Sequence, residues 1–404
     1  MRVSKATIRA VNGLTARWAD TTSGGTVFSA VGVWPLLALL ADGAAGAARA
    51  ELAQAVGVPA DRAGGAAREL LAGLGSVRGL EAALGLWTRR TLELRERWEA
   101  GLPAGAHGVL TGDAAADREA LDAWAAKRTG GLIERMPAAV TPDTEMVLVS
   151  ALALRTRWLR PFEEGYFAPE SGPWRGRELR GLWRESAVLD RIGVADTPDG
   201  HVTELKVLGD TAVDVHLLLG EEGMAPGRVL GAGIGVLART HPVVPGPRLP
   251  YGDAGPGLSV VREHTTTPEP PALDVTAPAY GLTADHDLLD RVELFGLTAA
   301  VRAVPGHFPG VSPYPLCVEA ARQSALARFD ARGFEAAAVT AMGAMGAGMP
   351  RARWLRTTVR AVFDRPFGFL AVHRHSRLVL AAGWVTDPEP HREDEEVYLP
   401  ESDH

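Results

Sequence analysis

Apolar residues recur every three or four positions over much of the first third of the chain. At the start they fall at Ile8, Val11, Leu14 and Trp18, which is the spacing of one face of an amphipathic helix. Residues 31–41 are apolar on every side, so the pattern predicts a helix that is buried in the core. The same reasoning predicts further helices over residues 5–19, 48–56, 62–74, 78–86, 92–100 and 117–128.

The pattern changes at residues 146–154, a continuous apolar run that is typical of a strand buried on both faces. One more helix is predicted over residues 283–295, where Thr283 can cap the first turn and Gly296 can end the last. Helices first and strands later, with long mixed segments, indicate an α+β fold. From residue 146 on, β signals dominate, and they predict strands over residues 204–207, 212–219, 258–262 and 272–275.

Composition narrows the possible classes of function. The chain has 404 residues, of which 46% are hydrophobic, so it can bury a large core. Its net charge of −7 argues against nucleic acid as a partner, because a nucleic-acid binder needs a basic face. No apolar run reaches the roughly 18–20 residues that a membrane span requires. The N-terminus shows no secretory signal, so we expect a cytoplasmic protein, although an extracellular location stays open.

Residues that could support catalysis, a cofactor or a metal are sparse. The single cysteine, Cys317, excludes internal disulfides and is predicted to be a small buried hydrophobe. His373 and His375 would share one face of a strand, but no third metal ligand stands near them. Residues 73–79 imitate a dinucleotide fingerprint with the wrong glycine spacing. We therefore predict no catalytic residue, no cofactor and no metal, and do not expect an enzyme.

A long run of small residues stands out near the C-terminus. Residues 333–350 carry one charge, Glu335, and lie between the alternating segment 324–330 and two strand-like segments at 359–364 and 369–373. Such a run costs conformational entropy and buries little surface. We therefore expect it to have a function.

Six segments are similar, in chain order, to motifs of one known family. They read VFSAVGVWPLLALLADGA at 27–44, WAAKRTGGLI at 124–133, LVSALALRTRWLRPF at 148–162, GFEAAAVT at 333–340, FDRPFGFL at 363–370 and LAAGWVTDP at 380–388. Together they resemble the serpin family, in a bacterial-type member. The resemblance implies a single domain over residues 1–390, with three β-sheets, eight to nine helices and an exposed reactive-centre loop at about 333–358. Residues 391–404 are acidic and are expected to form a disordered tail.

The resemblance also implies a mechanism. A protease attacks the loop as a substrate and forms an acyl-enzyme. The cut loop then inserts into the central sheet as a new strand, which distorts the tethered protease and traps it. The chain would thus be a suicide inhibitor of serine or cysteine proteases, and its active fold would be metastable.

Insertion as a strand requires that the side chains of the loop hinge that enter the core carry no charge. In the family's register, the residue after the hinge glycine points into the core, and alternate residues follow it. The single charge of the run, on Glu335, then falls on the outward face, where it needs no buried partner. The resemblance assigns the hinge to eight residues, Gly333, Phe334, Glu335, Ala336, Ala337, Ala338, Val339 and Thr340.

Some positions depart from the family pattern. Phe334 stands where inhibitory members have a small Thr or Ser at the first inserting position. The polar gate beneath the sheet would use Ser29, Ser150 and Gln323, and Trp158 would lie at the top of the sheet, where insertion begins. These departures leave an alternative, a non-inhibitory serpin-fold binding or scaffold protein whose loop is cleaved without trapping.

Counting about 14 residues from the hinge glycine places the reactive bond at Ala347–Gly348, with Arg351 and Arg353 as rival sites. A cut after alanine suits a subtilisin- or elastase-like serine protease, whereas a cut after arginine suits a trypsin-like enzyme. The protein is expected to be a monomer, with the target protease as its partner.

Overall fold

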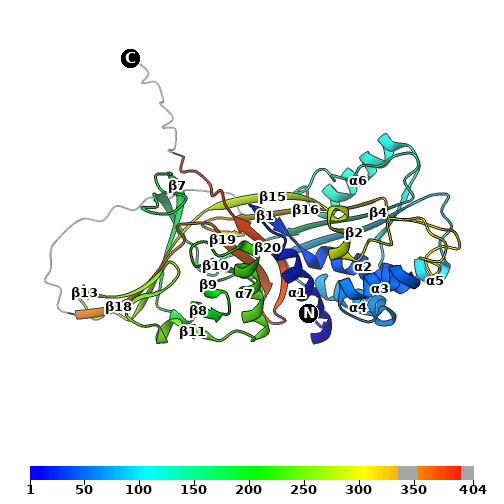
Figure 1. The fold of residues 1–404 in the computed structure, drawn as a ribbon. Coiled ribbons are helices and arrows are strands. Elements are labelled where there is room, and N and C mark those ends of the chain that lie inside the picture. The colour runs from blue at the N-terminus through cyan, green and yellow to red at the C-terminus, as the bar shows by residue number, and fades with distance from the viewer. Residues whose placement is uncertain (335–353, 393–404) are drawn as a thin grey trace, which may run out of the picture.

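The structure is a computed structural model that describes residues 1–334 and 354–392. These residues form eight α-helices, three short 3-10 helices and three β-sheets (Figure 1). The helices are α1 (Lys5–Ala19), α2 (Ala30–Gly43), α3 (Gly46–Val56), α4 (Ala60–Leu74), α5 (Glu96–Glu99), α6 (Ala114–Arg128), α7 (Pro226–Ala238), α8 (Val292–Phe295), η1 (Leu189–Arg191), η2 (Gly246–Arg248) and η3 (Leu288–Arg291).

The central sheet carries most of the features discussed below. Its order is β3-β2-β4-β16-β17-β5, and β15 pairs with the other edge of β16. Two neighbouring pairs are parallel, β4 with β16 and β2 with β3, whereas the pairs β2–β4, β15–β16, β16–β17 and β17–β5 are antiparallel. The bounds are β2 (Leu80–Arg89), β3 (His107–Leu110), β4 (Met146–Leu154), β5 (Thr156–Arg157), β15 (Tyr280–Asp287), β16 (Ala320–Phe329) and β17 (Gly333–Phe334).

The two other sheets lie toward one end of the central sheet, and one of them packs against its face there (Figure 1). One has the order β1-β20-β19-β10-β9-β8-β11, and the other β12-β13-β18-β14-β7-β6. Their bounds are β1 (Thr26–Phe28), β6 (Glu163–Phe167), β7 (Leu179–Ser186), β8 (Ile192–Thr197), β9 (Gly200–Leu208), β10 (Val213–Gly220), β11 (Val243–Pro245), β12 (Gly252–Gly255), β13 (Leu258–Thr265), β14 (Ala272–Pro278), β18 (Trp354–Val362), β19 (Phe367–His373) and β20 (Leu378–Val385).

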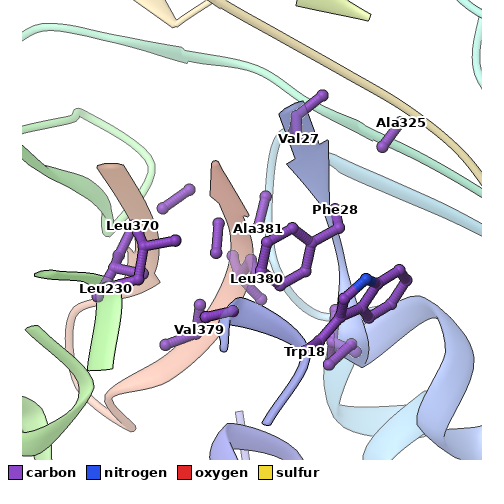
Figure 2. Close-up of a cluster of buried hydrophobic side chains, with 14 of the residues drawn as sticks. Trp18, Val27, Phe28, Leu230, Ala325, Leu370, Val379, Leu380 and Ala381 are labelled. Atoms are coloured by element: carbon purple, nitrogen blue, oxygen red, sulfur yellow. The ribbon is translucent and has the colours of Figure 1, made fainter. Parts of the chain in front are cut away.

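Both faces of the central sheet are covered, which explains the continuous apolar run of β4. Leu148 and Leu152 pack in the large core that contains α2, whereas Val147 and Val149 pack in a smaller cluster beneath α6. Every residue of β4 is buried. Figure 2 shows part of the large core, where Trp18 and Phe28 lie beside strand β20. The ring centroids of Trp18 and Phe28 are 4.8 Å apart.

Most of the predicted helices are present, and three predictions are wrong. The segment 78–86 belongs, from Leu80 on, to strand β2, which pairs with β4 and packs against both α6 and the large core. Residues 92–100 contain only the single turn α5. Residues 283–295 divide into the end of β15, then η3 and α8, and the cap is Asp287, which accepts a hydrogen bond from Leu289 N, rather than Thr283. Alternating burial on β15 shows the period of a strand.

The longest helices of the described ranges have 15 residues, whereas a bilayer span needs about 20. None of them combines the length and the apolar character that crossing a membrane demands.

Candidate functional site

The central sheet splits at one end between β4 and β16. The two strands are paired from Ala320 to Ala325, and beyond this point the short strand β17 lies between β16 and β5. Gly333 pairs with Arg157, and Phe334 pairs with both Thr156 and Phe329. The first two residues of the predicted hinge are therefore already part of the sheet, with antiparallel neighbours on both sides.

A tight turn brings the chain from β16 into β17. The Asp330 carboxylate accepts hydrogen bonds from Arg332 N at 2.8 Å and Gly333 N at 3.0 Å, and Asp330 N donates to Gly333 O at 3.0 Å. A side chain at Gly333 would collide with the Thr156 carbonyl oxygen, which belongs to rigid backbone. Glycine is thus required here by the close approach of β5.

Phe334 is the first residue whose side chain enters the core from the hinge. Only 1% of its surface is exposed, and its ring centroid lies 6.0 Å from that of Phe369 on β19. It points inward, as the register from the sequence requires. The ring is therefore accommodated at the position where relatives of this type were expected to carry a smaller residue.

Trp158 contacts the turn between β16 and β17, where the sheet splits. Its indole Nε1 donates to Asp330 O at 2.8 Å, and its backbone N donates to Arg332 O at 2.9 Å. Its ring packs against Phe329 with a centroid separation of 4.9 Å. Phe162 N donates to Ala331 O at 2.7 Å, so the turn before β17 is tied to the chain after β5 at several points.

Ser29, Ser150 and Gln323 form a second, fully buried polar cluster beneath the paired part of β4 and β16. Gln323 Oε1 accepts from Ser29 N at 2.7 Å, and Gln323 Nε2 donates to Ser29 O at 2.8 Å and to Ser150 Oγ at 3.0 Å. Gln323 stands directly opposite Ser150 in the β4–β16 ladder. We call these three residues the gate cluster.

Ser29 also joins the gate cluster to helix α2 and strand β20. Its hydroxyl donates to Leu380 O at 2.6 Å and accepts from Gly32 N at 3.3 Å, which caps α2. At Gly32 a Cβ atom would collide with the Ser150 hydroxyl, so glycine lets the helix approach the cluster. The three side chains are buried and hydrogen-bonded, and an unpaired polar group at such a position would cost about 1–3 kcal/mol.

Sequence reasoning missed one residue beside the gate cluster, His286. It lies opposite Gln323 in the β15–β16 ladder, and its Nε2 lies 2.8 Å from Val27 O. Burial lowers the pKa of His286, and the hydrogen bond to Val27 opposes that shift. The helix predicted over 283–295 concealed it, whereas the alternation along 280–287 would have placed it on the ladder.

Several predicted residues lie outside the described ranges. They are Glu335, Ala336, Ala337, Ala338, Val339, Thr340, the reactive bond Ala347–Gly348 and its rivals Arg351 and Arg353. The far end of the predicted loop, residues 354–358, is instead the first half of strand β18, which pairs with β13. The loop boundary at 358 is therefore wrong, because the main-chain groups from Trp354 on are already engaged in a sheet.

His373, His375 and Cys317 all lie within the described ranges. Among the residues of those ranges, no group of three or more potential metal ligands occurs. The rings of His373 and His375 are 5.8 Å apart, but His373 is buried and its Nδ1 lies 2.8 Å from Ser376 Oγ. Cys317 is half-buried, and burial together with Glu319 and Glu145 raises its thiol pKa to about 11.

Comparisons with curated proteins agree on one family. The family model Serpin (serine protease inhibitor) matches residues 9–171 and 258–388. The putative serpin-Z6C of Oryza sativa subsp. japonica is 25% identical over 399 residues, which cover 91% of each chain. Serpin-Z2A of the same organism is 26% identical over 402 residues, covering 90% of this chain and 91% of the relative. These relatives are plant proteins, so they do not support the bacterial type.

Solved structures agree on the fold. The thermophilic serpin tengpin in its native state superposes with a TM-score of 0.73 at 14% identity, covering 96% of this chain and 95% of tengpin. Thyroxine-binding globulin in complex with thyroxine gives a TM-score of 0.69 at 18% identity, covering 95% and 99%. The expected serpin fold, α+β with three sheets, is thus confirmed. Since the family model matches most of its length and the fold agrees, this chain belongs to the serpin family of serine protease inhibitors.

Proposed function

We propose that this protein is a suicide inhibitor of serine proteases, which traps the acyl-enzyme by inserting its cleaved loop into the central sheet. The observation that carries the proposal is the position of β17. Gly333 and Phe334 form the start of an antiparallel strand between β16 and β5, at the point where the sheet splits. The residues that follow them need only continue along the same line between β16 and β4.

The paired part of β4 and β16 is what an inserting strand would have to open. Six residue pairs, from Ala320–Val147 to Ala325–Leu152, form a parallel ladder. An antiparallel strand placed between them would replace this ladder by two antiparallel ladders, in which pairing is slightly more stable per residue. The exchange gains hydrogen bonds and buries the inward face of the loop, which gives a driving force for insertion.

Opening the ladder also costs the hydrogen bond between Gln323 and Ser150 in the gate cluster. A buried hydrogen bond of this kind contributes about 0.5–1.5 kcal/mol, and separated polar groups cost more until they find new partners. The gate cluster therefore adds to the barrier that keeps the uncleaved chain in its present arrangement. It does not prevent insertion once cleavage frees the loop.

The residue before the reactive bond determines which type of protease is the target. A strand of about 14 residues at about 3.4 Å per residue would carry the attached protease roughly 45–50 Å along the sheet. With Ala347–Gly348 as the bond, the target is a serine protease with a small or apolar first pocket, of the subtilisin or elastase type. A cut at Arg351 or Arg353 would instead indicate a trypsin-like target. In this proposal residues 1–390 act as one domain, and the protein acts as a monomer.

The test is adduct formation on denaturing gels with subtilisin-, elastase- and trypsin-like proteases. We expect a covalent adduct with at least one of them, and the mass of the released C-terminal fragment identifies the bond. Cleavage by all three without any adduct would contradict inhibition.

Two variants test the register. Ala336→Arg should turn the inhibitor into a substrate, because its charge would have to enter the core, whereas Ala337→Arg should still trap because it faces outward. Equal behaviour of the two variants would refute insertion in this register.

A further inference from the structure

A cavity of about 170 Å³ lies between strands β7, β9 and β14, next to residues 159 and 160, which follow strand β5. Among the described residues that line it, four are cations and none is an acid. They are Arg160, Arg184, Arg191 and Lys206. The chain as a whole carries a net charge of −7, so this concentration of positive charge runs against its composition. Apolar side chains complete the walls, among them Leu208, Leu273 and Val275.

Three of these cations have no carboxylate partner among the residues that the structure describes. Arg160, Arg184 and Arg191 form no ion pair within the described part of the chain, whereas Lys206 lies 3.2 Å from the buried Glu204. Neutral partners hold Arg184 instead. Its guanidinium lies over the Phe162 ring at 4.2 Å from the centroid, and its Nη1 donates to Arg160 O at 3.0 Å.

The arrangement is electrostatically costly for Arg184. Burial, together with the positive charges of Arg160 and Arg191, lowers the pKa of Arg184 to about 10. A guanidinium carries five N–H donors, and within the described ranges Arg184 uses one of them, in the bond to Arg160 O, which leaves the others available to the cavity that it lines. A cluster of this kind is stabilised by an anion that neutralises several cations at once.

We propose that this cavity binds a small anion that carries a phosphate or sulfate group on an apolar body. The planar forks of Arg160, Arg184 and Arg191 suit the oxygen atoms of such a group, which accept paired, charge-assisted hydrogen bonds. The apolar walls suit a ring or short alkyl chain. A cavity of about 150 Å³ is enough to hold benzene in a protein core, so the volume fits a phenyl-sized body.

Isothermal titration calorimetry of the full chain with phenyl phosphate tests the proposal. We expect saturable binding to the wild type, weaker binding of inorganic phosphate, and none of benzyl alcohol. Sodium chloride at the same ionic strength should not reproduce the signal. No protease takes part, so the result is independent of the proposed inhibition.

Variants locate the site. Arg160→Gln and Arg191→Gln each remove one uncompensated charge without touching the Phe162 contact, and each should weaken phenyl phosphate binding by about tenfold. Arg302→Gln is the matched control, because Arg302 is exposed and does not line the cavity. Circular dichroism checks that each variant folds. Unchanged affinity in both site variants, or an equal loss in the control, would overturn the site. Inorganic phosphate that binds as tightly as phenyl phosphate would overturn the apolar part of the ligand.

Discussion

His286 lies directly opposite Gln323 in the ladder between β15 and β16, beside the gate cluster. The imidazole also contacts Val27 O, two residues before Ser29, and packs edge-on against Trp18 with a centroid separation of 5.2 Å. A titratable ring thus borders the cluster that joins β4 and β16. Its protonation should affect the stability of this region.

The first prediction concerns the dependence of folding stability on pH through His286. Burial lowers the pKa of His286 in the folded state, so the folded chain binds its proton less readily than the unfolded chain does. Stability should therefore fall as pH drops below about 6.5, the ordinary value, and the loss should be complete below the folded pKa. His286→Gln keeps a hydrogen-bond donor but cannot titrate. Between pH 8 and 5, the melting temperature should fall more in the wild type than in this variant, and parallel curves would contradict the prediction.

The second prediction concerns the gate cluster. Ser150→Ala leaves one N–H of the buried Gln323 amide without a partner, which should lower the free energy of unfolding by about 1–3 kcal/mol. Ser23→Ala is the control, because Ser23 is exposed and should change stability by less than about 0.5 kcal/mol. Urea unfolding of the two variants measures the difference, and equal midpoints would show that the Gln323–Ser150 bond adds nothing.

Two segments that are buried on both faces gave one correct and one wrong prediction. The run at 146–154 is strand β4, and its two-sided burial follows from cover on both faces. The helix predicted over 78–86 failed because β2 is also buried on both faces, so its apolar residues do not alternate and cannot be distinguished from a helix by period.

No local sequence pattern could predict the gate cluster. Ser29 and Gln323 are 294 positions apart, so only the family resemblance brought them together. The register of Phe334 could be predicted because a strand alternates its side chains, but its partner Phe369 is set by tertiary packing.

The third prediction concerns the buried pair of Glu204 and His216. Their oxygen and nitrogen atoms are 2.7 Å apart, and Lys206 lies 3.2 Å from the same carboxylate. Burial alone would raise the pKa of Glu204, but the hydrogen bond and charge of His216, with Lys206, bring it below its ordinary value of 4.5. The stabilisation should then be fully present above pH 4.5 and be lost as pH falls through the folded pKa.

Glu204→Gln isolates this contribution. The variant should be less stable than the wild type by about 3 kcal/mol at pH 7, because a buried pair loses one charge. The difference should shrink between pH 4.5 and 3. If the difference in the free energy of unfolding stays constant down to pH 3, the packing of the side chain, rather than its charge, accounts for the stabilisation.

The fourth prediction concerns the thiol. With a pKa of about 11 instead of the ordinary 9.0, Cys317 should carry about a hundredfold less thiolate at pH 8 than an unfolded chain does. Since the thiolate is the nucleophile, iodoacetamide should alkylate the folded chain correspondingly more slowly than the chain in urea. Mass spectrometry follows the reaction, and similar rates in the two states would contradict the raised pKa.

The last prediction concerns Phe334 as the anchor of the hinge. Phe→Ala in a core commonly costs about 3–5 kcal/mol, but β17 has only two residues and can leave the sheet alone. The loss of global stability should therefore be small, and the effect should appear as local opening. In Phe334→Ala, hydrogen exchange at Gly333 and residue 334 should be at least about tenfold faster, while β16 stays protected. Tyr314→Ala, at a side chain that is 58% exposed, should leave exchange unchanged. Unaltered protection in Phe334→Ala would mean that the turn at Asp330, rather than the buried ring, holds β17 in the sheet.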